Sequence, residues 1–236
     1  MTAAMPRDSY ETRRDRLRAY FDETARDAWA RLTSDAPVSR IRATVRAGRD
    51  EMRARLLSWL PEDLTGQRVL DAGCGTGALS LEAAARGAEV VAVDIAPSLV
   101  TIAAERTPEE LRARIDWRVG DMADPALGQF DHVIAMDSLI HYRPQDMAAA
   151  VARLARRSTE RLAITFAPRT PLLTGMHLAG KLFPRSDRSP AIVPVSRGAL
   201  VARLRGTEAL DGVQIGRGHR VHRGFYISEA LELVRP

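Results

Sequence analysis

The chain has 236 residues, enough for one α/β domain with additions, and a formal net charge of +5. Lys181 is its only lysine, so arginine carries almost all of the positive charge, and arginine pairs with carboxylates and phosphates. This balance fits an anionic substrate, an acidic membrane surface or RNA. One cysteine, Cys74, excludes an internal disulfide. Because the chain has neither a bilayer-spanning run of ~20 apolar residues nor a signal-peptide core, we expect a cytoplasmic protein.

Two amphipathic helices are expected at the N-terminus. The first covers about residues 9–29, with aromatic positions that include Trp29 and a break near Tyr20-Phe21-Asp22. The second covers about 38–59 and combines an apolar stripe with an arginine-rich polar face. Such helices are either a packing layer on the following sheet or a lid over its site, and we favour the lid.

From Gln67 onward strands and helices alternate, which predicts a doubly wound α/β fold with a parallel sheet. We expect strands over 68–71, 89–94, 115–119, 132–136 and 162–166, and helices over 78–86, after Pro97 and over 146–157. Ligands of such sheets bind at the carboxyl ends of the strands, where every motif below falls.

The C-terminal third departs from this alternation. A stretch at about 170–195 mixes apolar residues, arginines and prolines and is expected to be a small inserted cap. A helix over 196–204 and two strands, about 208–216 and 223–233, would complete a seven-stranded Rossmann-like sheet with an antiparallel edge. The expected division is therefore an arm over 1–62 and a catalytic domain over 63–236.

The glycine-rich turn after the first strand is the strongest chemical signal. Asp71 ends that strand, and Gly73, Gly75 and Gly77 follow, which allows positive φ and close approach of a ligand to the backbone. Asp94 ends the next strand, where a carboxylate can accept both hydroxyls of a ribose. An acid ahead of the glycines would repel a pyrophosphate but suits an amine and a sulfonium, so we predict an S-adenosylmethionine site.

The order of these motifs over 67–166 resembles the class I S-adenosylmethionine-dependent methyltransferases. The resemblance implies that residues 71–77 surround the methionine part, that Asp94 takes the ribose, and that Asp121 and Met122 hold the adenine. A capped turn is the alternative for Asp121. Cys74 is interpreted as a small structural side chain under the turn. The full set implied to bind the cofactor is Asp71, Gly73, Cys74, Gly75, Gly77, Asp94, Ile95, Asp121, Met122 and Asp137.

A closer resemblance, nearly end to end, is to the magnesium-protoporphyrin IX O-methyltransferase family of bacteriochlorophyll and chlorophyll synthesis. Its motifs in this chain are Tyr20-Phe21-Asp22 and Trp29 in the arm, Val45-Arg46-Ala47-Gly48-Arg49, Asp137-Ser138-Leu139-Ile140-His141-Tyr142, Phe166-Ala167-Pro168-Arg169-Thr170-Pro171-Leu172 and Leu182-Phe183-Pro184.

This resemblance implies methyl transfer from S-adenosylmethionine to one porphyrin propionate, giving a monomethyl ester and S-adenosylhomocysteine. A propionate is ionised at pH 7, so alignment and exclusion of water matter more than a strong base. His141 would hydrogen-bond the propionate, with a packing or capping histidine as the alternative. Tyr20 would close from the arm over the methyl group, and the alternative is a core residue of an amphipathic helix.

Arg169, Arg185 and Arg188 are candidates to bind the second propionate, although each taken alone is more typical of a solvated charge. The magnesium would arrive inside the substrate, because no cluster has the spacing of a protein metal site. Docking on the large porphyrin-binding subunit of magnesium chelatase and peripheral association with the photosynthetic membrane are left open, and no nucleic acid partner is expected.

Three other functions share the cofactor core. They are a quinone-type small-molecule methyltransferase, an RNA methyltransferase and a non-catalytic porphyrin carrier. The RNA reading is weakened by Met136-Asp137-Ser138-Leu139, which lacks the proline-aromatic motif typical of enzymes that methylate exocyclic amines.

Overall fold

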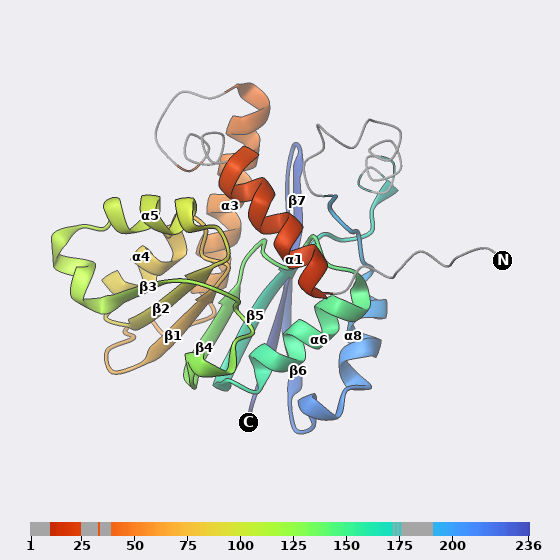
Figure 1. Cartoon of the computed structure of the whole chain (residues 1–236). Helices are drawn as coiled ribbons and strands as arrows, with labels where there is room; N and C mark the ends of the chain where they lie inside the picture. Colours follow the sequence, from red (N-terminus) through yellow and green to blue (C-terminus); the bar gives the residue numbers. More distant parts are fainter. Residues whose placement is uncertain (1–9, 25–32, 34–38, 172, 174, 176–190) are drawn as a thin grey trace.

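The protein is described by a computed structural model that covers residues 10–24, 33, 39–171, 173, 175 and 191–236. One seven-stranded sheet, with strand order β3-β2-β1-β4-β5-β7-β6, runs through the molecule (Figure 1). The predicted doubly wound sheet with an antiparallel edge is confirmed. The strands are β1 (Arg68–Ala72), β2 (Glu89–Asp94), β3 (Ile115–Val119), β4 (Phe130–Ala135), β5 (Ser158–Phe166), β6 (Gln214–Arg223) and β7 (Tyr226–Val234).

The first five strands are parallel, which brings their carboxyl ends to one edge of the sheet. β7 inserts antiparallel between β5 and β6. Alternate residues of the buried strands face opposite sides, since Val133 and Ile134 of β4 belong to different core clusters. Near-continuous apolar strands of this kind require cover on both faces.

Helices supply that cover. One face packs against α6 and α8, and the other against α3 and α4. α5 lies beside β2 and β3. The bounds of these helices are α3 (Arg40–Leu57), α4 (Ala78–Ala85), α5 (Pro97–Glu105), α6 (Pro144–Ala155) and α8 (Arg197–Arg205).

The N-terminal segment consists of two parts with different positions. α1 (Tyr10–Ala19) continues into a π-helical turn, η1 (Tyr20–Thr24), at the predicted break, and π-helical turns are frequent at functional sites. α3 instead packs on the sheet through buried Gly48, Met52, Leu56 and Leu57. The packing-layer alternative therefore describes α3. Trp29 lies outside the described residues.

The first of the two C-terminal strands differs from its prediction over 208–216. Residues Glu208–Leu210 form a 3-10 turn, η5, and β6 runs over Gln214–Arg223. The prediction ended the strand at Gly216, but Gly216 and Gly218 lie within the strand at a shift in the β6–β7 register. A Cβ on Gly216 would lie 2.7 Å from the Glu232 carboxylate, so glycine makes room there for a buried acid.

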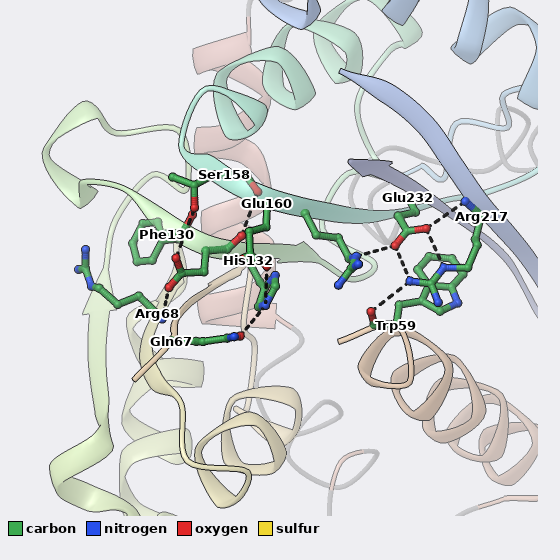
Figure 2. A network of polar contacts seen from close by, with 12 residues as sticks. Trp59, Gln67, Arg68, Phe130, His132, Ser158, Glu160, Arg217 and Glu232 are labelled. Carbon is green, nitrogen blue, oxygen red and sulfur yellow. Dashed lines mark hydrogen bonds and ion pairs between the residues drawn. The ribbon is translucent and has the colours of Figure 1, made fainter. Parts of the chain in front are cut away.

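Polar side chains connect the opposite, amino-terminal ends of the strands (Figure 2). The His132 ring, fully buried on β4, lies 2.7 Å from the Gln67 side-chain oxygen. Glu232 on β7 accepts from Arg217, whose guanidinium lies over the Trp59 ring. These contacts connect β4, β6 and β7 to the segment between α3 and β1, at the end of the sheet away from the glycine-rich turn.

The predicted cap has its two chain ends side by side. Pro168 and Val195 form a parallel bridge, and Arg169 N–H donates to the Val195 carbonyl at 3.0 Å. An insertion that leaves and returns at one point fits an added segment, although most of 170–195 lies outside the described residues. Within the described part of the chain, no helix is both long and apolar enough to cross a bilayer.

Candidate active site

The glycine-rich turn joins β1 to α4 and holds the backbone that a cofactor would approach. Gly73, Gly75 and Gly77 all have positive φ, at 89°, 55° and 83°. At Gly77 a Cβ would lie 2.3 Å from the Trp117 ring, so both the conformation and the space require glycine. The N–H groups of Gly73 and Cys74 donate to the Val93 carbonyl on β2. The turn is therefore fastened to the neighbouring strand by backbone hydrogen bonds.

Two buried acids flank this turn. Asp71 is 2 % exposed and accepts from the Ser80 hydroxyl at 2.6 Å. Burial, with a contribution from nearby Asp94, raises the pKa of Asp71 to about 7. Burial also raises the pKa of Asp94, whose carboxylate accepts from the N–H groups of Gly75 and Ala96 at 2.9 Å each. Because burial makes both carboxyl groups hard to ionise, a ligand that brings positive charge would stabilise their ionised forms.

Two further observations indicate that these residues could hold a positively charged cofactor. Apart from Gly75 itself and its two chain neighbours, no atom of the described residues lies within 4 Å of the position of a Cβ on Gly75, so the turn borders open space. The buried Ser138 hydroxyl faces the turn and has no hydrogen-bond partner within the described structure. Burial raises the pKa of the Cys74 thiol well above its ordinary value, which agrees with a structural and not a reactive cysteine.

Asp121 and Met122 lie just past the end of β3, where the adenine was predicted. Asp121 Oδ1 accepts from the Ala123 N–H at 2.8 Å, the capped turn that the sequence left as an alternative. Its Oδ2 accepts from Arg14 of α1 at 3.1 Å. Met122 is buried, and Ile95 packs against the same core cluster. The acid is thus both a turn residue and a contact of the arm.

His141 lies in the loop after β4, covered by the arm. Its ring is 5.8 Å from that of Phe21, and Tyr20 packs edge-on against Phe21 at 5.3 Å. Arg13 of α1 donates to the His141 carbonyl at 2.7 Å. The sequence singled out Tyr20 and missed Phe21 and Arg13, although Phe21 stands inside the same motif.

The other predicted residues are distributed more widely. The Asp137 side chain is buried and accepts from protein donors that include Arg49 and Tyr226, so its cofactor contact stays a prediction. Arg169 is exposed at the carboxyl end of β5. Arg185 and Arg188 lie outside the described residues. No group of three or more His, Cys, Asp or Glu side chains within the described part of the chain has the arrangement of a metal site.

Fold and site together define a class I S-adenosylmethionine-dependent methyltransferase. The family profiles "Methyltransferase domain" and "Magnesium-protoporphyrin IX methyltransferase C-terminus" match residues 69–160 and 135–235. The chain is 53% identical over 235 residues to the magnesium-protoporphyrin O-methyltransferase of Rhodobacter capsulatus, covering 97% of this chain and 99% of that protein. It is 33% identical to the Synechocystis protein of the same name, covering 93% and 95%.

The crystal structure of the Synechocystis magnesium protoporphyrin IX methyltransferase with bound S-adenosylhomocysteine has a TM-score of 0.83 to this structure. Sequence identity there is 31%, and the match covers 95% of this chain and 100% of that one. This chain belongs to the magnesium-protoporphyrin O-methyltransferase family.

Proposed function

We propose that this protein transfers the methyl group of S-adenosylmethionine to a propionate carboxylate of magnesium protoporphyrin IX, in (bacterio)chlorophyll biosynthesis. The products are the monomethyl ester and S-adenosylhomocysteine. One observation carries the proposal. In this member of the magnesium-protoporphyrin O-methyltransferase family, the residues expected to bind the cofactor and the residue expected to bind the methyl acceptor lie at the same edge of the sheet. The acids Asp71 and Asp94 border the glycine turn, and His141 lies beyond Ser138 under Phe21 of the arm.

S-adenosylmethionine supplies an electrophilic methyl group when bound. Asp71 and the turn would hold its charged end, Asp94 the ribose, and Asp121 with Met122 the adenine. A propionate is already ionised at neutral pH, so the chain needs no strong base. Its task is to orient one carboxylate oxygen and to exclude water from two opposite charges.

His141 is our candidate to orient that carboxylate. His141 is 9 % exposed and its ring packs near that of Phe21, so a hydrogen bond made there would be shielded from water. Tyr20, behind Phe21, is the second candidate on the acceptor side. Arg169, Arg185 and Arg188 remain candidates for the second propionate.

The part of the predicted arm that would cover the site is α1 with η1. Arg14 contacts Asp121, Arg13 contacts the His141 loop, and Asp22 accepts from the Ser98 N–H at the start of α5 at 2.8 Å. All three contacts go to segments at the carboxyl edge of the sheet. We propose that this segment closes over the bound cofactor and porphyrin. Docking on the chelatase subunit or on a membrane stays a further proposal.

The test is incubation of the purified protein with S-adenosylmethionine and magnesium protoporphyrin IX, followed by chromatography and mass measurement. We expect a product heavier by one methylene and equal formation of S-adenosylhomocysteine. Parallel reactions contain metal-free protoporphyrin, a quinol precursor with a free hydroxyl, and RNA. Methylation of the quinol or RNA without porphyrin ester would refute the proposal, and porphyrin binding without turnover would favour a carrier.

A further inference from the structure

Asp137, the second residue after the end of β4 at Ala135, has an unusual backbone. Its φ is 55°, a positive value that no other non-glycine residue of the described chain has. Aspartate tolerates this left-handed region better than most residues, but the conformation is still unfavourable and needs support from its surroundings. The side chain is only 8% exposed, so that support comes from buried contacts.

Four protein groups donate to the Asp137 carboxylate. Arg49 of α3 contacts Oδ2 at 2.9 Å, and the Tyr226 hydroxyl of β7 lies 3.1 Å from Oδ1. Thr165 of β5 donates to Oδ1 at 3.2 Å and also accepts from the Asp137 N–H at 2.7 Å. Ser228 contacts Oδ1 at 3.4 Å. A carboxylate has about four acceptor positions, so these donors account for its capacity.

The element that brings Arg49 to this acid is pressed tightly on the sheet. A Cβ on Gly48 would lie 2.5 Å from the Tyr226 ring, so only glycine lets α3 approach β7 this closely. Arg49 and Tyr226 thus reach the same carboxylate from adjacent surfaces. This contact explains why glycine and arginine stand at positions 48 and 49 of the motif Val45-Arg46-Ala47-Gly48-Arg49.

The loop that begins at Asp137 carries the acceptor side of the site. Ser138 comes next, packed against the glycine turn at Gly73. Further on, the Ile140 carbonyl accepts from the Val193 N–H at 2.8 Å, and His141 follows it. The direction in which the chain leaves β4 therefore determines where the His141 ring lies.

We propose that Asp137 is a positioning residue for His141. Its carboxylate, held by Arg49 and Tyr226, fixes the left-handed turn from which the loop starts, and so sets the distance between the acceptor carboxylate and the methyl group. The inference rests on the proposed function, because it takes His141 as the acceptor-side residue. It assigns Asp137 a role other than the cofactor contact predicted from the sequence.

The experiment compares Asp137→Asn with the matched control Asp116→Asn. Asparagine keeps the size and tolerates positive φ, but it removes the charge and turns one acceptor into a donor. Asp116 is an exposed acid on β3 that pairs with Arg118. We expect Asp137→Asn to lower kcat about 10- to 100-fold, with the Kd of S-adenosylhomocysteine within threefold of wild type, and Asp116→Asn to leave both unchanged.

A double-mutant cycle separates positioning from general destabilisation. If Asp137 acts through His141, Asp137→Asn should reduce kcat less than threefold in a His141→Ala background. Equal losses in both backgrounds would overturn the proposal. A Kd for S-adenosylhomocysteine weakened more than tenfold would instead place Asp137 in the cofactor site. Should Asp137→Asn fail to fold, Tyr226→Phe removes one donor only and serves the same cycle.

A second readout does not depend on turnover. The protein has five histidines, and labelling their Cε1 atoms gives five NMR signals, with His141 assigned by its loss in His141→Ala. In the S-adenosylhomocysteine complex, Asp137→Asn should shift or broaden the His141 signal, and Asp116→Asn should not. An unchanged signal contradicts the inference. Absence of ester formation by the wild type would refute the proposed function alone.

Discussion

Asp71 has a carboxyl group whose pKa of about 7 lies near physiological pH. The ionised form attracts the amine of the cofactor, whereas the neutral form does not. Cofactor binding should therefore release a proton from Asp71 and become stronger as pH rises. We expect the Kd of S-adenosylhomocysteine, measured by calorimetry, to fall up to about tenfold between pH 6 and pH 8.

Asp71→Asn is the control for this pH dependence. The variant cannot ionise, so its affinity should be lower at pH 8 and nearly constant between pH 6 and 8. His141→Ala should keep the wild-type slope, because His141 is assigned to the acceptor side. A slope that survives in Asp71→Asn would assign the titration to another group, with Asp94 the first to examine.

His141 and Tyr20 are expected to affect the chemical step and not cofactor binding. His141→Ala removes the proposed hydrogen bond to the propionate and should lower kcat by roughly 10²-fold. Tyr20→Phe keeps the ring packed on Phe21 and should cost less, roughly tenfold. Steady-state kinetics with the porphyrin and calorimetry with S-adenosylhomocysteine check both. Loss of S-adenosylhomocysteine affinity in parallel with kcat would contradict the acceptor-side assignment.

The described contacts that hold α1 and η1 at the carboxyl edge of the sheet differ in strength. The Arg14–Asp121 pair is partly exposed and should contribute little, about 0–1 kcal/mol. Leu17 is 4% exposed within the core cluster. The Asp22 side chain, although distant in sequence from α5, accepts directly from the N–H of Ser98 at the start of that helix. We expect these two residues to determine closure. Leu17→Ala and Asp22→Ala should speed amide hydrogen exchange in 10–24 and lower kcat/KM several-fold.

Arg18→Ala is the matched control on the same helix, because Arg18 is exposed. It should change neither exchange nor kcat/KM. The global Tm should stay within about 2 °C of wild type in all three variants, since only the arm opens. A lower Tm with unchanged exchange in 10–24 would show that these residues stabilise the core instead.

Elements with a local signal could be predicted from the sequence. β2 and β3 match their predicted bounds, because an apolar run ends at Asp94 in β2 and an alternation of apolar and charged residues ends before Gly120 in β3. β6 does not match, because its continuation past Gly216 depends on pairing with β7 and on the space that Gly216 leaves for Glu232, neither of which has a local signal. The site divides in the same way. The glycine turn has a local signature, whereas the Asp137 contacts join residues 49, 137, 165 and 226, which only the fold brings together.

At the scale of the molecule, one end of the sheet carries the candidate active site and the other carries polar contacts that stabilise the fold. The carboxyl ends carry the acids, the glycine turn and His141. The amino ends carry the packed polar network of Figure 2, in which Glu232, 2 % exposed, lies 2.7 Å from Arg161 and 2.6 Å from Arg217. Burial opposes ionisation of Glu232, but hydrogen bonds from Arg217 outweigh it and lower its pKa. The stability from this group is present above its ordinary pKa and is lost as pH falls through the lowered value.

Glu232→Gln should therefore affect stability and not catalysis. Glutamine keeps the size of the side chain but removes the charge that pairs with Arg161 and Arg217. Because the Arg217 side chain is 49% exposed, water compensates part of the loss, and we expect a cost of about 1–3 kcal/mol. For a chain of this size, that corresponds to a fall in Tm of about 2–12 °C. The Tm is measured by calorimetry and kcat at 20 °C. The control is Glu89→Gln, which removes an exposed acid. Because the substituted group lies at the opposite end of the strands, kcat should stay within twofold, and a larger loss would mean that the two ends of the sheet are coupled.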